Sequence, residues 1–241
     1  MTSPEDDDQR SLLAMIIDPP NAIAGLCALM AALHAALAFA PARLVGQVWR
    51  LFELSPRPVL MALERGDVAS AARAFLGYMF FHVNAAHLLI NLAAILALGA
   101  VVYREMEARA AARKSDAAAA FIAFFMISGM AAGAAFVLAR PDAYQPMIGA
   151  SGGAAGLAGA CAWLFVTRTG EGGGLAGDAL NFVILVLTSA VLIIASIYLD
   201  TSPLSHKLFG SASAWQAHVG GYVFGVFAYP LFERLAGAAA R

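Results

Sequence analysis

Six long apolar stretches constrain the fold of this chain more than any other feature. Each holds about 20 residues, and at about 1.5 Å of rise per helical residue that length crosses the hydrocarbon core of a bilayer. An α-helix also satisfies its own backbone polar groups, which lipid cannot do. We therefore expect an all-α, polytopic membrane protein with six transmembrane helices. The stretches run from Pro20 to Ala40, Phe80 to Tyr103, Ala117 to Ala139, Gly149 to Arg168, Leu180 to Leu199 and Ala212 to Phe232.

The composition supports a membrane protein and argues against several other classes. Hydrophobic residues make up 61% of the chain and charged residues 13%, whereas a soluble domain carries about 25% charged residues. The net charge of −1 gives no reason to expect a nucleic-acid partner. Cys27 and Cys161 both lie in apolar stretches, so we interpret them as packing residues rather than a disulfide or a zinc site. We expect no metal and no other cofactor.

The chain divides into a short acidic tail at residues 1–19, one membrane domain at 20–235 and a short tail at 236–241. The acidic start differs from the positive start of a secretory signal. The first connection, 41–79, alternates aromatic residues with Arg and Glu, which predicts a segment lying at the membrane interface, and Asp67 is placed to cap a helix there. Abundant Ala and a preference for Arg over Lys are typical of a GC-rich bacterial genome, so we expect a bacterial inner membrane.

Polar side chains inside the spans gather in the even-numbered ones. Such side chains are costly in lipid, so each is a candidate site residue. The even-numbered spans run in the same direction and carry these residues near their beginnings, which places them in the same half of the bilayer. The residues are His82, His87 and Asn91 in the second span, Ser151 in the fourth and His218 in the sixth.

The spacing of these residues predicts how the helices meet. His87 and Asn91 are four residues apart and therefore share one helical face. Gly221 and Gly225 face nearly the same way as His218 and would let the sixth helix press against the fourth, which has its own glycines around Ser151. On the local sequence alone, a small packing residue is the more common role for a serine such as Ser151.

The cluster has the chemistry of a serine hydrolase. A serine hydroxyl is a weak nucleophile that needs an adjacent base, and an imidazole serves that role near neutral pH. Imidazole, amide and backbone N–H groups could hold a tetrahedral oxyanion. No Asp or Glu lies within the second, fourth or sixth apolar stretch, so a Ser–His dyad is expected rather than a triad.

These motifs and their order resemble the rhomboid family of intramembrane serine proteases. GASG at Gly149–Gly152 is similar to the family's GxSG, and AHVGGYVFG at Ala217–Gly225 is similar to AHxxGxxxG. The stretch FFHVNAAHLLINL carries the two histidines and the asparagine of the second span, and the pair Trp49-Arg50 lies in the first connection. The resemblance covers about Pro20 to Phe232.

The resemblance implies a role for each candidate residue. Ser151 would be the nucleophile and His218 the general base, and His87, Asn91 and the Ser151 backbone N–H would form the oxyanion hole. Supporting roles would fall to His82, Gly149, Gly152, Gly221 and Gly225. The substrates would be single-span membrane proteins cut within the bilayer, with the fifth span as a lateral gate and residues 200–211 as a cap.

Orientation is open from charge alone, because basic residues are nearly balanced between the two sides. The resemblance implies a cytoplasmic N-terminus and a water-filled active site that opens to the periplasmic or outer side. The sequence indicates neither the natural substrate nor the oligomeric state.

Two departures from the family pattern and three alternatives stand beside this interpretation. Ala155 occupies the position where many members place an aromatic residue that stacks on the catalytic histidine, and Trp49-Arg50 lies unusually far from His82. The alternatives are a catalytically inactive rhomboid-like binder of membrane helices, a transporter or proton channel, and a metal site built from His82, His87 and His218.

Overall fold

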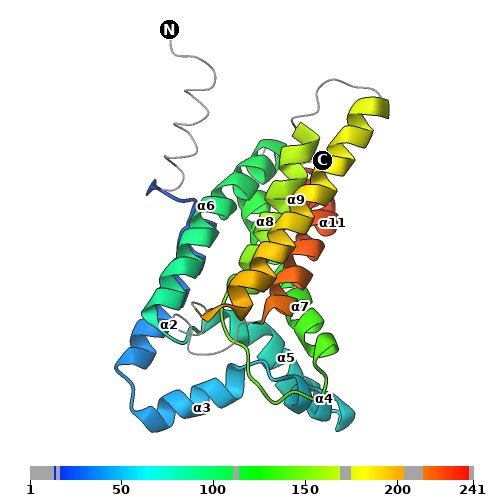
Figure 1. Ribbon diagram of the computed structural model, residues 1–241. Coiled ribbons are helices and arrows are strands. Elements are labelled where there is room, and N and C mark those ends of the chain that lie inside the picture. The colour runs from blue at the N-terminus through cyan, green and yellow to red at the C-terminus, as the bar shows by residue number, and fades with distance from the viewer. Residues whose placement is uncertain (1–13, 15–16, 111–113, 169–174, 204–213, 239–241) are drawn as a thin grey trace.

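The computed structural model describes residues 14, 17–110, 114–168, 175–203 and 214–238 (Figure 1). Within these residues the regular elements are helices, together with one isolated β-bridge between Leu54 and Met147. The elements are α2 (Asn21–Ala38), α3 (Ala42–Phe52), α4 (Pro56–Glu64), α5 (Val68–Gly77), the 3-10 turn η1 (Tyr78–Phe80), α6 (Ala85–Ala110), α7 (Lys114–Ala139), α8 (Ser151–Arg168), α9 (Leu175–Thr201) and α11 (Trp215–Ala238).

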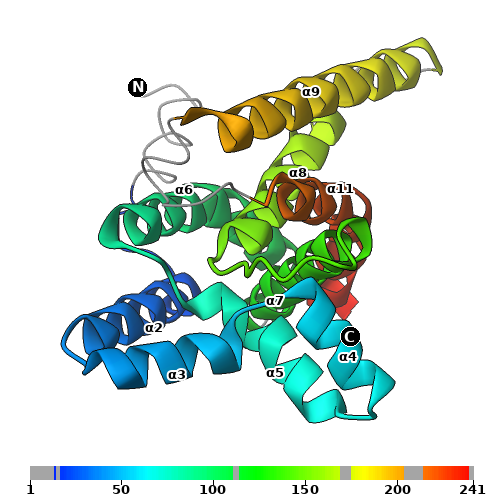
Figure 2. The ribbon, with the colours of Figure 1, turned by 60° about the horizontal axis from the view of Figure 1, so that its bottom comes forward.

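Six long helices form a bundle, and the short helices form a layer across one end of it. The bundle consists of α2, α6, α7, α8, α9 and α11, while α3, α4 and α5 lie across its lower end (Figure 1). Seen from that end, the short helices lie in front and α9 lies at the far edge (Figure 2). Helix α8 packs against α6, α7, α9 and α11. This confirms the predicted all-α membrane bundle.

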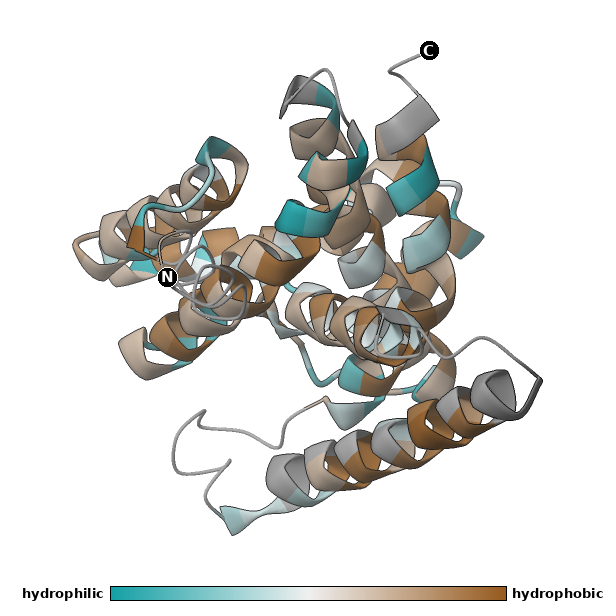
Figure 3. Ribbon diagram, turned by 90° about the horizontal axis from the view of Figure 1, so that it is seen from above, coloured by the Kyte–Doolittle hydropathy of each residue, from teal (hydrophilic) through white to brown (hydrophobic). Residues whose placement is uncertain are grey.

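The hydropathy of the helices fits a membrane environment. Three described helices are long and apolar enough to cross a bilayer by length and composition, namely Asn21–Ala38, Ala85–Arg109 and Asp116–Ala139. The apolar stretches in α8 and α9 are shorter, at Ser151–Thr167 and Phe182–Ala195. Hydrophobic residues cover most of the long helices, including the face that α9 presents at the edge of the bundle (Figure 3). The chain is an integral membrane protein.

Aromatic side chains fill the core between the long helices. Phe124 of α7 is fully buried and meets Tyr229 and Phe232 of α11 edge to face, with ring centroids 5.8 and 5.3 Å apart. Such pairs stabilise a core beyond the apolar area that they bury. These aromatic pairs join α7 to α11 at a distance from the end of the bundle that carries Ser151 and His218.

Several helix ends differ from the sequence-based prediction. Helix α6 begins at Ala85 rather than Phe80, because Phe81 is extended and His82 lies in the loop that follows it. Helices α6 and α9 extend beyond the apolar stretches, to Ala110 and back to Leu175, through residues that mostly favour a helix. Helix α11 continues to Ala238, beyond the apolar stretch that ends at Phe232 and into the predicted tail at 236–241, and the ion pair between Arg109 and Glu233, at 3.4 Å, ties this extension to α6.

Other predicted segments lie partly or wholly outside the described residues. These are most of the acidic tail at 1–19, residues 239–241 of the second tail, and most of the predicted cap at 200–211.

The first connection, 41–79, is a folded layer rather than an irregular loop. The side-chain carboxylate of Asp67 caps α5 by accepting a bond from the Ser70 amide at 3.0 Å, as predicted. Arg73 of α5 donates to the carbonyl of Leu51 at the end of α3, at 3.1 Å. A second hydrophobic core joins this layer to α7, and it contains Leu54, Val59, Ala71, Ala74, Tyr78, Met79 and Val137.

Candidate active site

Ser151 occupies the first position of α8, where backbone N–H groups have no acceptor inside the helix. The first bond into the helix is donated by Ala154 to the carbonyl of Ala150, at 3.0 Å. Just before it, Gly149 has φ +120°, a conformation that side chains other than glycine rarely adopt. This turn starts α8 at the serine, and Ser151 is half-buried there.

His218 reaches Ser151 from the beginning of α11. Its Nε2 lies 2.8 Å from the Ser151 Oγ, so the hydroxyl can donate to the unprotonated ring nitrogen. The two residues are 67 positions apart in the chain and belong to different helices. A serine bonded to an imidazole in this way is the arrangement needed to activate the hydroxyl as a nucleophile.

Glycines hold α8 and α11 in direct backbone contact next to this pair, further along both helices. A Cβ built on Gly221 would collide with the carbonyl oxygen of Gly152, and one on Gly225 would collide with that of Gly156. Small residues permit this close approach of helices in membranes. The separation of Ser151 and His218 is therefore determined by touching backbones rather than by intervening side chains.

His87 and Asn91 lie on one face of α6, and His87 is directed at the turn before the serine. A Cβ built on Gly149 would lie 2.6 Å from Cε1 and 2.7 Å from Nε2 of His87, so the imidazole occupies the space that the glycine leaves. Asn91 is 3% exposed and donates from Nδ2 to the His87 carbonyl at 2.8 Å. An amide nitrogen carries two protons, so a second one remains for another acceptor.

His82 contacts the same turn from the loop before α6. Its Nε2 accepts a bond from the Ala150 amide at 3.4 Å, and its ring meets that of His87 edge to face with centroids 5.1 Å apart. The side chain is 4% exposed. His82 thus bonds to the residue before Ser151, and its supporting role stays a prediction.

Four hydrogen bonds at or near the site were not anticipated from the sequence. Asn84 caps α6 by accepting a bond from the His87 amide at 2.8 Å, and the general preference for Asn at helix starts could have revealed it. Tyr78 accepts a bond from the Gly149 amide through its carbonyl and donates its buried hydroxyl to the Gly129 carbonyl at 2.7 Å. Tyr222 of α11 is bonded to Ser189 of α9, with the two oxygens 3.0 Å apart.

The remaining features singled out in the sequence lie elsewhere or are small. Trp49-Arg50 belongs to α3, in the layer at the lower end of the bundle. Ala155 is half-buried on α8, one turn after Ser151. Among the described residues, no three His, Cys, Asp or Glu side chains gather into a group that could hold a metal ion.

Comparison with known protein families gives one match. The family model described as the rhomboid domain matches residues 69–234, which include Ser151, His218, His87, Asn91 and His82 but begin after Trp49-Arg50. No curated protein and no solved structure matches the chain. With more than half of its residues in this match, and with a helical membrane bundle around them, the chain belongs to the rhomboid family.

Proposed function

We propose that the protein is an intramembrane serine endopeptidase that cleaves transmembrane segments of other membrane proteins with a Ser151–His218 dyad. The observation that carries this proposal is the 2.8 Å contact between Oγ and Nε2 at the start of two adjacent helices. Members of the rhomboid family are generally proteases of this kind, although inactive members exist.

The proposed reaction follows from the geometry of these groups. The Ser151 Oγ attacks the carbonyl carbon of the scissile bond while His218 Nε2 takes the hydroxyl proton. The resulting oxyanion is stabilised by the Ser151 backbone N–H, His87 and Asn91. The imidazolium then protonates the leaving amine, and an acyl-enzyme remains. Water, deprotonated by His218, hydrolyses this ester and restores the serine.

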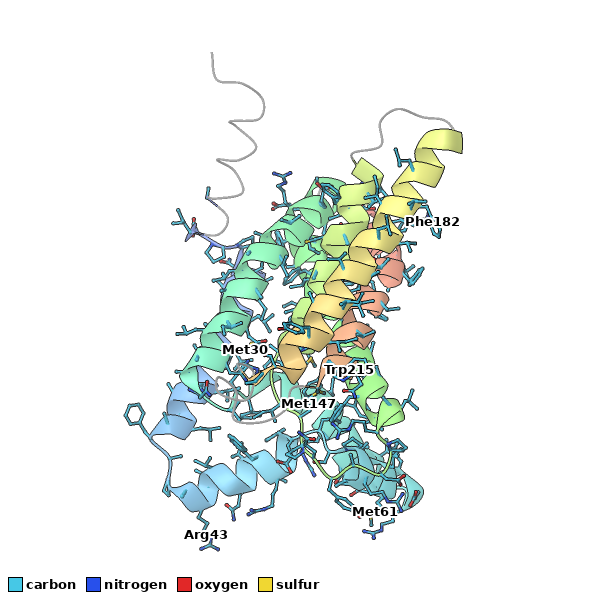
Figure 4. All side chains as sticks on the ribbon, viewed as in Figure 1. Met30, Arg43, Met61, Met147, Phe182 and Trp215 are labelled. Carbon is cyan, nitrogen blue, oxygen red and sulfur yellow. The ribbon has the colours of Figure 1, made fainter. Side chains whose placement is uncertain are left out.

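We further propose that the substrates are single-span membrane proteins and that the N-terminus faces the cytoplasm. Under this orientation the lower end of the bundle, with the dyad and the first connection, faces the periplasmic or outer side of a bacterial inner membrane. Trp215 and Met147, close in sequence to His218 and Ser151, both lie at this lower end (Figure 4).

A fluorophosphonate probe tests the proposal without knowledge of the substrate, because it reacts with activated serines. We expect the purified, detergent-solubilised protein to be labelled and Ser151→Ala and His218→Ala to remain unlabelled. Equal labelling of Ser151→Ala would mean that the nucleophile is misassigned. A folded wild-type protein that neither reacts with the probe nor cleaves a transmembrane test peptide would instead be an inactive binder of membrane helices.

A further inference from the structure

The segment that leads into the serine is held by the first connection through main-chain bonds. This segment, residues 143–150, is here called the approach segment. Leu54 and Met147 exchange two bonds, with the Leu54 amide donating at 3.0 Å and the Met147 amide at 2.9 Å. The Arg57 amide donates to the Ala143 carbonyl at 2.9 Å. The approach segment is therefore bonded to the first connection at Ala143 and again at Met147.

The same segment is held again close to the serine. The Gly149 amide donates to the Tyr78 carbonyl at 2.9 Å, and the Ala150 amide donates to His82 Nε2. Residues from 54 to 82 thus bond to the approach segment along its whole length. Met147 lies between the bundle and the layer of short helices, where its side chain packs on the second hydrophobic core (Figure 4).

Part of this anchoring comes from outside the matched family region. The match begins at residue 69, whereas Leu54 and Arg57 precede it. Leu54 is fully buried, and a Cβ built on Gly133 would lie 2.8 Å from its Cδ2, so Leu54 is fixed against α7. Pro56 begins α4, and Arg57 follows it in the first turn, where a backbone amide has no acceptor within the helix and can bond to another segment. These residues join the approach segment to rigid elements.

We propose that the segment from Leu54 to Arg57 positions the nucleophile, with the Arg57 main-chain amide as its outermost contact. This inference rests on the proposed protease function and adds positioning residues to it. Bonds to the approach segment restrict where Gly149 turns, and that turn determines where Ser151 meets His218. A displacement of a fraction of an ångström lowers the rate of a reaction that depends on alignment.

The test compares two substitutions at one position. Arg57→Ala keeps the amide but removes the side chain, which forms an exposed ion pair with Glu64 at 3.3 Å. Arg57→Pro also removes the amide, and proline is tolerated in the first turn of a helix. We expect the detergent-solubilised Arg57→Pro protein to react with the fluorophosphonate probe about two- to tenfold more slowly than Arg57→Ala, the range for one lost hydrogen bond.

Thermal unfolding and steady-state kinetics separate positioning from general destabilisation. For a transmembrane test peptide we expect kcat to fall while KM and the melting temperature stay close to those of Arg57→Ala. Equal labelling rates in the two variants would overturn the inference. Absence of labelling in the wild type as well would contradict the proposed function instead.

A second pair of variants decides the matter if Arg57→Pro does not fold. A glycine inserted between Ser55 and Pro56 moves Arg57 away from Ala143 while Leu54 keeps its place. A glycine inserted after Gly66, in the turn between α4 and α5, is the control of equal length. Slower labelling of the first insertion alone supports the inference, and equal rates of both insertions overturn it.

Discussion

Gly149 meets two demands that no other residue type satisfies together. Its φ of +120° excludes side chains on conformational grounds, and the His87 ring occupies the space of a Cβ. The glycine therefore shapes the turn and at the same time determines how close an imidazole comes to the serine. The glycine two residues before Ser151 has a physical explanation in these two contacts.

Gly149→Ala should consequently impair the site more than it impairs folding. We expect labelling by the fluorophosphonate probe to fall by about 100-fold, the cost of removing an oxyanion-hole donor, because the methyl group displaces His87. Gly66→Ala is the matched control: Gly66 also has a positive φ, of 75°, but nothing lies within 4 Å of its Cβ position. Both variants should lose some thermal stability, and a similar loss of labelling in both would contradict this explanation.

His82 offers a second test at the level of one side chain. Its Nε2 accepts the Ala150 amide, so a replacement that keeps an acceptor should preserve part of the activity. We expect His82→Gln to be labelled faster than His82→Leu, since leucine leaves a buried amide without its acceptor. Labelling rates of the two variants, compared at equal folded fraction by thermal unfolding, check this expectation.

Helix α9 lies at the edge of the bundle (Figure 2). It packs on α8 and α11, and much of its described surface is exposed and apolar, including Leu180, Phe182, Leu187, Val191, Ile194 and Tyr198. The Ser189–Tyr222 bond links it to α11 one turn after His218. For the proposed protease, we propose that this helix acts as a lateral gate.

Weakening the Ser189–Tyr222 bond should make it easier for helical substrates to reach Ser151. We expect Ser189→Ala and Tyr222→Phe each to raise cleavage of a transmembrane test peptide by about two- to tenfold, the range for one interhelical hydrogen bond in a membrane. Labelling by the small soluble probe should not change, because the dyad is untouched. Thr167→Val is the control, because it removes a hydroxyl near the end of α8 that lies far from Ser151. Unchanged peptide cleavage in both variants would contradict the expectation that the Ser189–Tyr222 bond restricts the movement of α9.

The cap of α5 predicts a pH dependence for the first connection. The side-chain and backbone bonds from Ser70 lower the pKa of Asp67 below its ordinary value of 3.8. The stabilisation that the Asp67 carboxylate gives to the folded first connection is therefore fully present above pH 3.8 and is lost as the pH falls through the lowered pKa. We expect Asp67→Asn, which still caps, to remove this pH dependence and Asp67→Ala to lower the melting temperature at neutral pH. Melting curves between pH 7 and pH 3 measure both effects.

The helices could largely be predicted from the sequence, whereas the bonds that hold the approach segment before Ser151 could not. Ser151 and His218 could be singled out because polar side chains in apolar stretches are rare, and alternating span direction places them in one half of the membrane. The bonds of Leu54 and Arg57 to residues 143–147 use backbone atoms only, which every residue type possesses. Such bonds leave no side-chain pattern, so the sequence does not reveal them.

At the scale of the whole molecule, the two ends of the bundle differ in what they carry. The lower end holds the dyad and the layer of short helices, while the upper end carries the Arg109–Glu233 ion pair between α6 and α11. The proposed orientation assigns these ends to opposite sides of the membrane.

Cysteine labelling tests this orientation directly. In a background with Cys27 and Cys161 replaced by alanine, Arg43→Cys in α3 and Arg234→Cys near the end of α11 place exposed thiols at the two ends. Arg43 lies in the layer of short helices (Figure 4). We expect a membrane-impermeant maleimide to label Arg43→Cys in intact cells and Arg234→Cys only after permeabilisation. The reverse pattern would invert the proposed topology.

The glycine contacts between α8 and α11 also bear on how the protein responds to its lipids. Bilayers of different thickness tilt and shift helices, at a cost of fractions of a kcal/mol per Å of mismatch. Because Gly221 and Gly225 touch the backbone of α8, these two helices are expected to move as one body. Changes of lipid would then leave the serine–histidine geometry intact and act on α9, so in the proposed protease bilayer thickness would control substrate access rather than chemistry.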